Sequence, residues 1–317
     1  MNKIEFGDCR ETMRRWAADG VKVQTCVTSP PYFGLRDYGH DGQIGLEQTP
    51  AQYIEAMVEV FRCVRDVLAD DGTLWVNIGD SYARTGGTDL KVSNTAKVGS
   101  TRNTLEQMSD RTSKAAALGL KHKDLIGIPW MLAFALRADG WYLRQDIIWH
   151  KPNPMPESVR DRCTKAHEYV FLLSKSDRYF YDHEAMKEPS LYFGKDKRSG
   201  RGNIRYEGKR TEGDAKANGQ QSFVTINETR NRRSVWTVAT RPDKGAHFAT
   251  FPPALIEPCI LAGSRPGDIV LDPFMGSGTT AAVALQHGRQ YLGCELNPDY
   301  GRLQQERIDA AFLSQIC

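Results

Sequence analysis

The chain has 317 residues, of which 40% are hydrophobic and 26% charged, a composition typical of a soluble globular protein with a sizeable core. It contains no run of about 18 apolar residues, which argues against a membrane span, and its N-terminal segment MNKIEFGDCRETM lacks the apolar core of a signal peptide, so we expect a cytoplasmic protein. The seven cysteines form no CxxC pair and no Cys/His cluster, so we expect reduced thiols and no metal site.

The net charge of +3 conceals an uneven distribution of charge along the chain. Residues 84–123 carry 8 basic and 3 acidic side chains and residues 187–244 carry 14 and 7, whereas the rest of the chain carries 20 and 29. Two basic segments on an acidic scaffold are typical of a protein that binds a polyanion such as nucleic acid. Charge alone leaves open that both segments are solvated loops rich in Lys and Arg.

Strand-like and helix-like patterns alternate in the first 83 residues. The run VQTCVTS (23–29) predicts a short strand, residues 51–72 predict a helix that ends at Gly72, and GTLWVNIGD (72–80) predicts a second, buried strand. This alternation is typical of a parallel sheet covered by helices. Residues 84–123 follow, rich in Gly, Ser, Thr and Lys, and predict a long mobile loop of the kind that is usually functional.

Regular structure resumes after this loop. Residues 126–141 predict a helix that begins near Pro129 and ends at Gly140. The segments LRQDIIWH (143–150), EYVFLLSK (168–175) and RYFYD (178–182) predict three strands, the last two forming a hairpin.

The C-terminal third combines a basic segment with a second α/β pattern. Residues 187–245 are basic and Gly-rich with interleaved aromatic side chains, which predicts an inserted recognition segment. From Phe251 onward the patterns predict, in order, a helix (252–263), a strand (268–274), a Gly-rich turn (275–280), a helix (281–288), a strand (290–296) and a final helix.

The segment DIVLDPFMGSGTT (268–280) predicts a nucleoside-binding turn. An apolar strand runs into a turn that contains Gly276 and Gly278, and a helix opens there with unpaired N–H groups. Asp272 ends this strand, and Glu295 ends the next strand, where a carboxylate can accept hydrogen bonds from a ribose. A nicotinamide dehydrogenase would carry the third glycine of GxGxxG, and an ATP-driven enzyme would carry a Walker A loop, and the sequence has neither.

The segment TSPPY (28–32) ends the first predicted strand with two prolines and an aromatic ring. Proline alone explains the end of a strand, because it fixes its own φ and restricts the residue before it. Together, however, TSPPY and DPFMGSGTT resemble the two signature motifs of the S-adenosylmethionine-dependent DNA amino-methyltransferases, which methylate N4 of cytosine or N6 of adenine. The catalytic motif [DNS]PP[YFW] precedes the cofactor motif by about 240 residues here, which is similar to the permuted β-class order.

The resemblance covers the chain except for the two basic segments. It implies a doubly wound, mostly parallel α/β sheet of the seven-stranded methyltransferase type, with inserted recognition segments. It also implies five regions: a catalytic half in two pieces (1–83 and 124–186), a basic mobile loop (84–123), a target-recognition segment (187–245) and a cofactor-binding half (246–317).

The catalytic residues implied by the resemblance are Ser29, Pro30, Pro31 and Tyr32. The Ser29 hydroxyl and the Pro30 carbonyl can accept the two hydrogens of an exocyclic amino group and aim its lone pair at a methyl group. Pro31 forces the extended backbone that displays this carbonyl. Because a base inside a duplex cannot reach a cleft, such enzymes flip it out, and Tyr32 is the ring on which the flipped base would stack.

Further positions follow from the family motifs. The cofactor-binding candidates are Asp8, Asp80, Ser81, Thr250, Phe251, Asp272, Pro273, Phe274, Gly276, Gly278, Thr279 and Glu295. The target-base pocket candidates are Phe33, Trp149, Lys151 and Asn153. The sequence leaves open that Asp8 and Asp80 are helix or turn caps and that Phe33 and Trp149 belong to the core.

The implied partner is duplex DNA, with a companion restriction endonuclease and a homodimer as further expectations. The DNA-binding candidates are Arg198, Arg201, Arg205, Arg210, Arg232 and Arg233. Ser29, where other family members carry Asp, favours N4 of cytosine over N6 of adenine. Methylation of RNA or of a protein glutamine is a remoter alternative, since those relatives have the opposite motif order and Asn at this position. A DNA-binding module that has lost activity is a third, which the intact motifs argue against.

Overall fold

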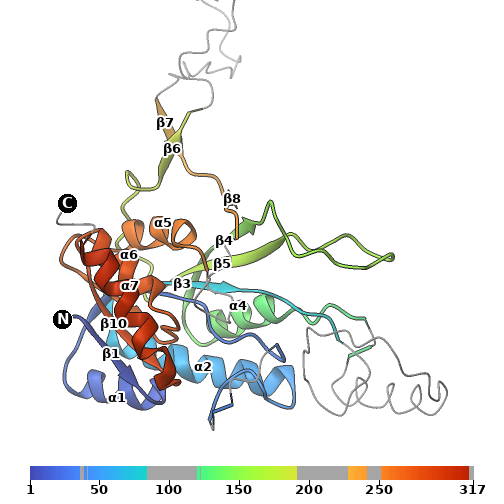
Figure 1. The fold of residues 1–317 in the computed structure, drawn as a ribbon, viewed down its shortest axis with the longest axis horizontal. Helices are drawn as coiled ribbons and strands as arrows, with labels where there is room; N and C mark the ends of the chain where they lie inside the picture. Colours follow the sequence, from blue (N-terminus) through green and yellow to red (C-terminus); the bar gives the residue numbers. More distant parts are fainter. Residues whose placement is uncertain are drawn as a thin grey trace, which may run out of the picture. The chain divides into compact units, whose positions relative to one another are not determined.

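The computed structural model of the chain describes residues 1–35, 39–40, 42–83, 120–121, 123–190, 228–240 and 251–313. Within these residues, eight strands form one sheet (Figure 1). In spatial order they are β1 (Lys3–Phe6), β10 (Gln290–Glu295), β9 (Ile269–Asp272), β2 (Val23–Thr28), β3 (Leu68–Ile78), β5 (His167–Ser174), β4 (Tyr142–His150) and β8 (Val235–Thr237). All neighbours pair in parallel except β5, which runs antiparallel to β3 and β4.

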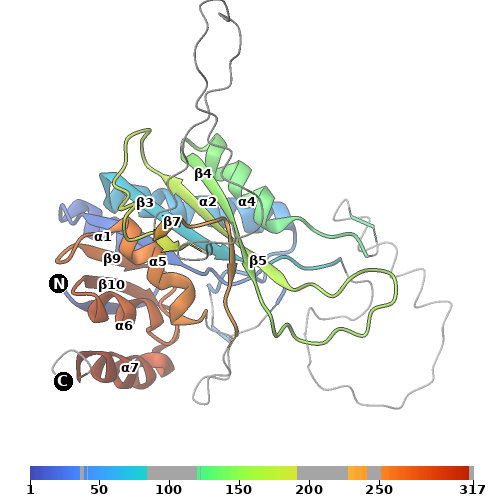
Figure 2. The same ribbon diagram turned by 90° about the horizontal axis from the view of Figure 1, so that it is seen from above.

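Helices cover both faces of this sheet, so the predicted doubly wound α/β fold is confirmed. On one face lie α1 (Cys9–Ala18), α2 (Pro50–Val67) and α4 (Ile128–Ala138), and on the other lie α5 (Pro253–Gly263), α6 (Thr279–Gln286) and α7 (Gly301–Leu313) (Figure 1). Seen from above, α6 and α7 lie side by side (Figure 2). A short 3-10 helix, η1 (Pro298–Tyr300), leads into α7.

The core forms where α2 and α4 pack on the central strands. Strand β3 is buried from Gly72 to Ile78, as expected for a strand covered on both faces. Helix α2 contributes Tyr53, Met57 and Phe61, all fully buried, at helical spacing. This helix begins with a capping box, in which the Thr49 side chain accepts from the Gln52 N–H and the Gln52 side chain accepts from the Thr49 N–H.

The structure corrects two details of the predicted elements. The helix predicted to run to Gly72 ends at Val67, because Leu68 already pairs with Val23 of β2 and begins strand β3. The predicted hairpin of residues 168–175 and 178–182 is absent, because both edges of β5 are occupied by β3 and β4. Residues 178–182 pack near the sheet instead, where Tyr181 stacks against Trp75 at a centroid distance of 6.4 Å.

Contacts divide the chain into two compact units, residues 1–182 with 234–317, and residues 183–233. The described part of the second unit contains β6 (Lys187–Pro189) and β7 (Thr229–Asn231), which pair in antiparallel and share a Glu188–Arg230 ion pair of 2.8 Å. Most of the predicted loop 84–123 and of the predicted recognition segment 187–245 lies outside the described residues. No helix among the described residues is long and apolar enough to cross a membrane.

The capping box of α2 generates a stability prediction. Replacing Thr49 by Ala leaves the Gln52 N–H without its side-chain acceptor, so we expect a loss of about 1 kcal/mol in unfolding free energy. Urea denaturation of the two proteins measures the difference. Gln48→Ala, at the exposed position just outside the cap, is the control and is expected to match the wild type. Equal loss in both variants would contradict the role of the cap.

Candidate active site

A cleft of about 300 Å³ lies at the carboxyl ends of the parallel strands. The segments that follow β1, β2, β9 and β10 all contribute to its walls, as is typical of ligand sites in open α/β sheets. Its lining includes all four predicted catalytic residues. It also includes nine of the predicted cofactor or base-pocket positions on its two sides: Asp8, Phe251, Pro273, Phe274, Gly276, Thr279, Glu295, Trp149 and Lys151.

The glycine turn between β9 and α6 is held by helix α7. Gly278 precedes α6 with a φ of 85°, and a Cβ there would lie 3.3 Å from the Gln304 Cα, so that only glycine fits this approach. The Gln304 side-chain amide donates to the Gly276 carbonyl at 2.7 Å. Arg307 donates to the Ser277 hydroxyl at 2.8 Å. Helix α7 therefore fixes the turn that the sequence predicts to be a cofactor site.

Glu295 closes one side of this turn. Its carboxylate accepts from the Gly276 N–H at 2.7 Å and from the Asn297 N–H at 2.9 Å. Burial raises the pKa of this carboxyl above its ordinary value, and the two N–H donors partly offset the effect. A carboxylate at the end of the strand next to the glycine turn is the arrangement that the sequence predicted for the acceptor of a ribose.

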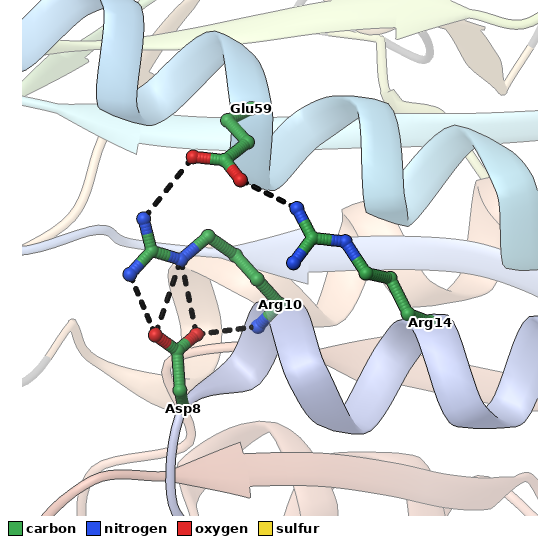
Figure 3. A network of polar contacts seen from close by, with 4 residues as sticks. All are labelled: Asp8, Arg10, Arg14 and Glu59. Atoms are coloured by element: carbon green, nitrogen blue, oxygen red, sulfur yellow. Dashed lines mark hydrogen bonds and ion pairs between the residues drawn. The ribbon is translucent and has the colours of Figure 1, made fainter.

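Asp8 lies on the same side of the cleft, at the start of α1. Its carboxylate caps the helix by accepting from the Arg10 N–H at 2.8 Å, and it also accepts from the Arg10 guanidinium (Figure 3). Arg10 and Arg14 both bind Glu59 of α2, so that the four residues form one network (Figure 3). The hydrogen bonds from Arg10 hold the pKa of Asp8 below its ordinary value, so this carboxylate remains charged at the cleft.

The TSPPY segment is held from two sides. The Tyr53 hydroxyl on α2 donates to the Pro31 carbonyl at 2.9 Å. The Tyr32 hydroxyl donates to the Glu168 carboxylate at 2.7 Å and lies 3.3 Å from the Asn77 side-chain oxygen. Among the described residues, no N–H or O–H group donates to the Pro30 carbonyl, so this oxygen keeps its acceptor capacity at the cleft.

Glu168 is the centre of a polar cluster on the opposite side from the glycine turn. Besides the Tyr32 hydroxyl, it accepts from the Asn77 amide at 3.2 Å and forms an ion pair with Lys151. The Lys151 ammonium also lies over the Trp149 ring, 4.2 Å from its centroid. Burial, followed by the nearby Glu168 charge, raises the pKa of Tyr32 well above its ordinary value, so its hydroxyl stays protonated and donates.

Sequence reasoning missed Glu168 and Asn77, although both line the cleft. Asn77 is a polar residue inside a run of buried strand residues, and this interruption is a signal that the sequence contains. Glu168 stands at the start of the apolar run EYVFLL, where nothing local distinguishes it from a solvent-exposed strand end.

Asp272 lies behind the cleft and does not line it. Its side chain is buried with 1% exposure, and it accepts from the Thr28 hydroxyl at 2.6 Å, the Thr280 hydroxyl at 2.6 Å and the Phe274 N–H at 3.0 Å. Burial raises the pKa of this carboxyl to about 6, against the effect of the three donors. All three hydrogen-bond donors to Asp272 therefore belong to the TSPPY segment and the glycine-turn segment, which lie on the two sides of the cleft.

Other predicted site residues also lie outside the cleft lining. Asp80 accepts from the Gly127 and Ile128 N–H groups and so caps α4, and Ser81 follows it. Phe33 is buried in the core against Tyr53. Asn153 exchanges hydrogen bonds with the Thr240 backbone.

The structure does not describe all of the predicted positions. Arg232 and Arg233 lie in the second compact unit. The remaining predicted positions lie outside the described residues, namely Thr250, Arg198, Arg201, Arg205 and Arg210. Within the described part of the chain, no group of three His, Cys, Asp or Glu side chains is placed to hold a metal ion.

The chain is similar in sequence to known DNA methyltransferases. A family model described as DNA methylase, of the N6/N4 methyltransferase type, matches residues 23–306. The type II methyltransferases M.Cfr9I of Citrobacter freundii and M.SmaI of Serratia marcescens are each 48% identical to the chain. The first match covers 95% of this chain and 86% of the relative, and the second covers 96% and 90%.

Solved structures with the same fold include two DNA methyltransferases. The PvuII DNA methyltransferase, described as cytosine-N4-specific, has a TM-score of 0.61 at 17% identity and covers 98% of this chain and 91% of its own. TTHA0409 of Thermus thermophilus, described as a putative DNA modification methylase in complex with S-adenosyl-L-methionine, has a TM-score of 0.58 at 22% identity and covers 98% and 96%. At these identities the likeness concerns the fold.

The raised pKa of Asp272 generates a prediction on stability and pH. Because the pKa rises from 3.8 to about 6 on folding, the stability contributed by this carboxyl is complete below pH 3.8 and is lost as the pH rises through 6. Asp272→Asn removes this titration. We therefore expect the variant to gain up to about 3 kcal/mol relative to the wild type between pH 4 and pH 8, measured by urea denaturation at several pH values.

Asp268→Asn, on a carboxylate just before the same strand, is the control and should show no such gain. A stability difference that does not change with pH, or one that changes in the opposite sense, would show that the buried carboxyl does not titrate in this window.

Proposed function

Because the chain belongs to the N6/N4 family of S-adenosylmethionine-dependent DNA amino-methyltransferases, we propose that its target is the exocyclic N4 of cytosine in duplex DNA. The observation that carries this choice is Ser29 at the first position of the catalytic motif, beside the Pro30 carbonyl at the cleft. In the family that the motifs resemble, Ser at this position leans towards cytosine and Asp towards adenine.

Ser29 and Pro30 supply what the nucleophile requires. The lone pair of an exocyclic amino group is delocalised into the ring, and acceptors placed at both of its hydrogens favour the pyramidal nitrogen that can attack. The Ser29 hydroxyl and the Pro30 carbonyl are two such acceptors. S-adenosylmethionine, when bound, would supply the methyl group that the amino nitrogen attacks, and its sulfur would keep the electron pair of the broken C–S bond. The nitrogen then loses one proton through its hydrogen bond to the Ser29 oxygen and on to water.

Tyr32 supplies the stacking surface for the flipped base. Its ring rests against Gly79, where a Cβ would lie 2.7 Å from the Tyr32 Cε2. Its hydroxyl is held at the ring's edge by Glu168 and Asn77, so that the ring orientation is set before DNA binds. Flipping a base costs a few kcal/mol, and stacking on an aromatic ring returns about 1–3 kcal/mol of this.

Lys151 can contact a flipped base of either kind, because cytosine N3 and adenine N1 are both ring acceptors next to the exocyclic amino group. An ammonium has three N–H donors and no acceptor, and the Lys151 ammonium uses one contact for Glu168 and one for the face of Trp149. It therefore retains a donor for an acceptor on a bound base.

The glycine turn, Glu295 and Asp8 fit the cofactor. Glu295 would accept from the ribose hydroxyls, and Phe274, Gly276 and Thr279 would border the nucleoside. The charged Asp8 carboxylate would attract the cationic methionine end. Because Arg10 and Glu59 hold Asp8 in place, this end of the cleft needs little rearrangement on binding.

The remaining parts of the proposal concern the partners. The basic segments 84–123 and 187–245 would hold DNA phosphates, with Arg side chains of the second segment reading base edges. We further propose a companion restriction endonuclease, a homodimer and a cytoplasmic location. The relatives are named type II methyltransferases, which supports the proposal of a companion endonuclease.

The product tests the proposed base. Duplex DNA incubated with the protein and labelled S-adenosylmethionine, then digested to nucleosides and analysed by mass spectrometry, is expected to contain N4-methylcytosine. N6-methyladenine as the product would overturn the choice of base, and label in RNA or protein but never in DNA would overturn the substrate class. Ser29→Ala is expected to slow methylation roughly 10²-fold, whereas Ser176→Ala, on the turn after β5, is expected to leave the rate unchanged.

The contact between Gly79 and Tyr32 generates a second prediction. Gly79→Ala displaces the Tyr32 ring, and overpacking of about 1–3 kcal/mol corresponds to a loss of roughly tenfold to hundredfold in kcat/KM for DNA. Affinity for S-adenosylmethionine, measured by titration calorimetry, is expected to stay unchanged. In a Tyr32→Ala background, Gly79→Ala should not lower kcat/KM any further. An equal loss in both backgrounds would show that Gly79→Ala does not act through the Tyr32 ring.

A further inference from the structure

The two sides of the cleft meet at the strand pair β2 and β9. Strand β2 leads into TSPPY, and β9 leads into the glycine turn. The backbone pairing between these strands is short, with Thr25 opposite Val270 and Cys26 opposite Leu271. Beyond Leu271 and Asp272 the chain continues with Pro273, which has no N–H to donate to a ladder. The strand ends are therefore joined by side chains at the level of the cleft.

Asp272 makes this connection. One of its carboxylate oxygens accepts from the Thr28 hydroxyl of β2 at 2.6 Å, and the other accepts from the Thr280 hydroxyl of α6 at 2.6 Å. The Thr28 and Thr280 side chains are as buried as the carboxylate, with exposures of 1% and 0%. Thr28 directly precedes Ser29, and Asp272 directly precedes the cleft residues Pro273 and Phe274.

A carboxylate determines the orientation of these hydroxyls more strictly than an amide would. An ionised carboxylate only accepts, so both threonine hydroxyls must donate to it. An asparagine side chain has one acceptor oxygen and one donor nitrogen, so at least one hydroxyl would have to turn round. Within the described residues no Lys or Arg forms an ion pair with Asp272, so its buried charge rests on these short hydrogen bonds.

We propose that Asp272, with Thr28 and Thr280, is a positioning residue for methyl transfer: it sets the Ser29–Pro30 acceptors at a constant position relative to the glycine turn that holds the methyl donor. The inference rests on the proposed role of TSPPY and does not depend on which base is methylated. Asp272 touches neither base nor cofactor in this arrangement, and its effect passes through Thr28 and the turn. A small misplacement of reacting groups is costly, since about 1 Å can reduce a rate roughly 10²-fold.

Kinetics of single and double variants test the proposal. Thr28→Val and Asp272→Asn are each expected to lower the single-turnover rate of methyl transfer roughly 10- to 100-fold. Their dissociation constants for S-adenosylmethionine and for target DNA, measured by calorimetry and fluorescence anisotropy, should stay within about twofold of the wild type. The double variant should be little slower than either single variant, because both remove the same interaction.

Thr25→Val is the matched control. Thr25 lies on the same strand, is fully buried, and shares a hydrogen bond of 2.9 Å with Thr73 rather than with Asp272. Its loss should destabilise the protein, measured by urea denaturation, while the methyl-transfer rate stays near that of the wild type. Asp268→Asn serves as the corresponding control for Asp272→Asn.

Three results would overturn the proposal: rates of Thr28→Val and Asp272→Asn within about twofold of the wild type, losses that multiply in the double variant, or an equal loss in Thr25→Val. Total methyl transfer is counted whatever base receives it, so N6-methyladenine as product would leave this test intact. Ser29→Ala, measured in parallel, tests the role of TSPPY separately. Full activity of this variant would show that TSPPY does not have the role on which the inference rests.

Discussion

The parallel pairing of β2 with β9 is the constraint on which the cleft depends. These two strands belong to segments separated by most of the chain, and the hydrogen bond between Thr28 and Asp272 joins residues 244 positions apart. Because the strands run in parallel, the segments that leave their carboxyl ends emerge at the same edge of the sheet. TSPPY and the glycine turn thus face the same cleft although their order along the chain is permuted.

The walls of this cleft are held by polar contacts that exist before any ligand binds. Asp8 is oriented by Arg10, which is itself bound to Glu59. Tyr32 is oriented by Glu168, which also binds Lys151. Groups that are already oriented lose less freedom when a ligand arrives, and a charge held in a partly dry site interacts more strongly with it. The polar pairs therefore determine the shape of the site as much as its charge.

Helix α7 shows how a distant segment contributes to the same arrangement. Gln304 and Arg307 do not carry any motif, but their side chains hold the glycine turn through Gly276 and Ser277. The sequence of α7 predicts a helix but no functional role, yet this helix supports the cofactor side of the cleft. Similarly, Tyr53 on α2 holds the Pro31 carbonyl on the catalytic side.

Elements with a strong local pattern were predictable, including β2, β9, the glycine turn and the helices α5 and α6. The predictions failed where tertiary pairing decided the outcome. Leu68 leaves the helical pattern because β2 offers it a partner, and residues 178–182 find no strand edge because β3 and β4 occupy both sides of β5. Asp80 stays a predicted cofactor residue, and the structure shows that it also caps α4 by accepting from two N–H groups, a role that the sequence leaves open.

The sequence by itself determined the chemistry of this protein. TSPPY and DPFMGSGTT are local motifs, and together they indicate a methyltransferase through their resemblance to the two signature motifs of that family. The tertiary structure decided which carboxylates face the cleft and which support it. Glu168 lines the cleft with no local signal, and Asp272, which stands in the motif itself, lies behind it between two threonines. The physical reason is that the partners of a side chain come from strands and helices far away in the chain. No single segment of the sequence predicts how those elements pair.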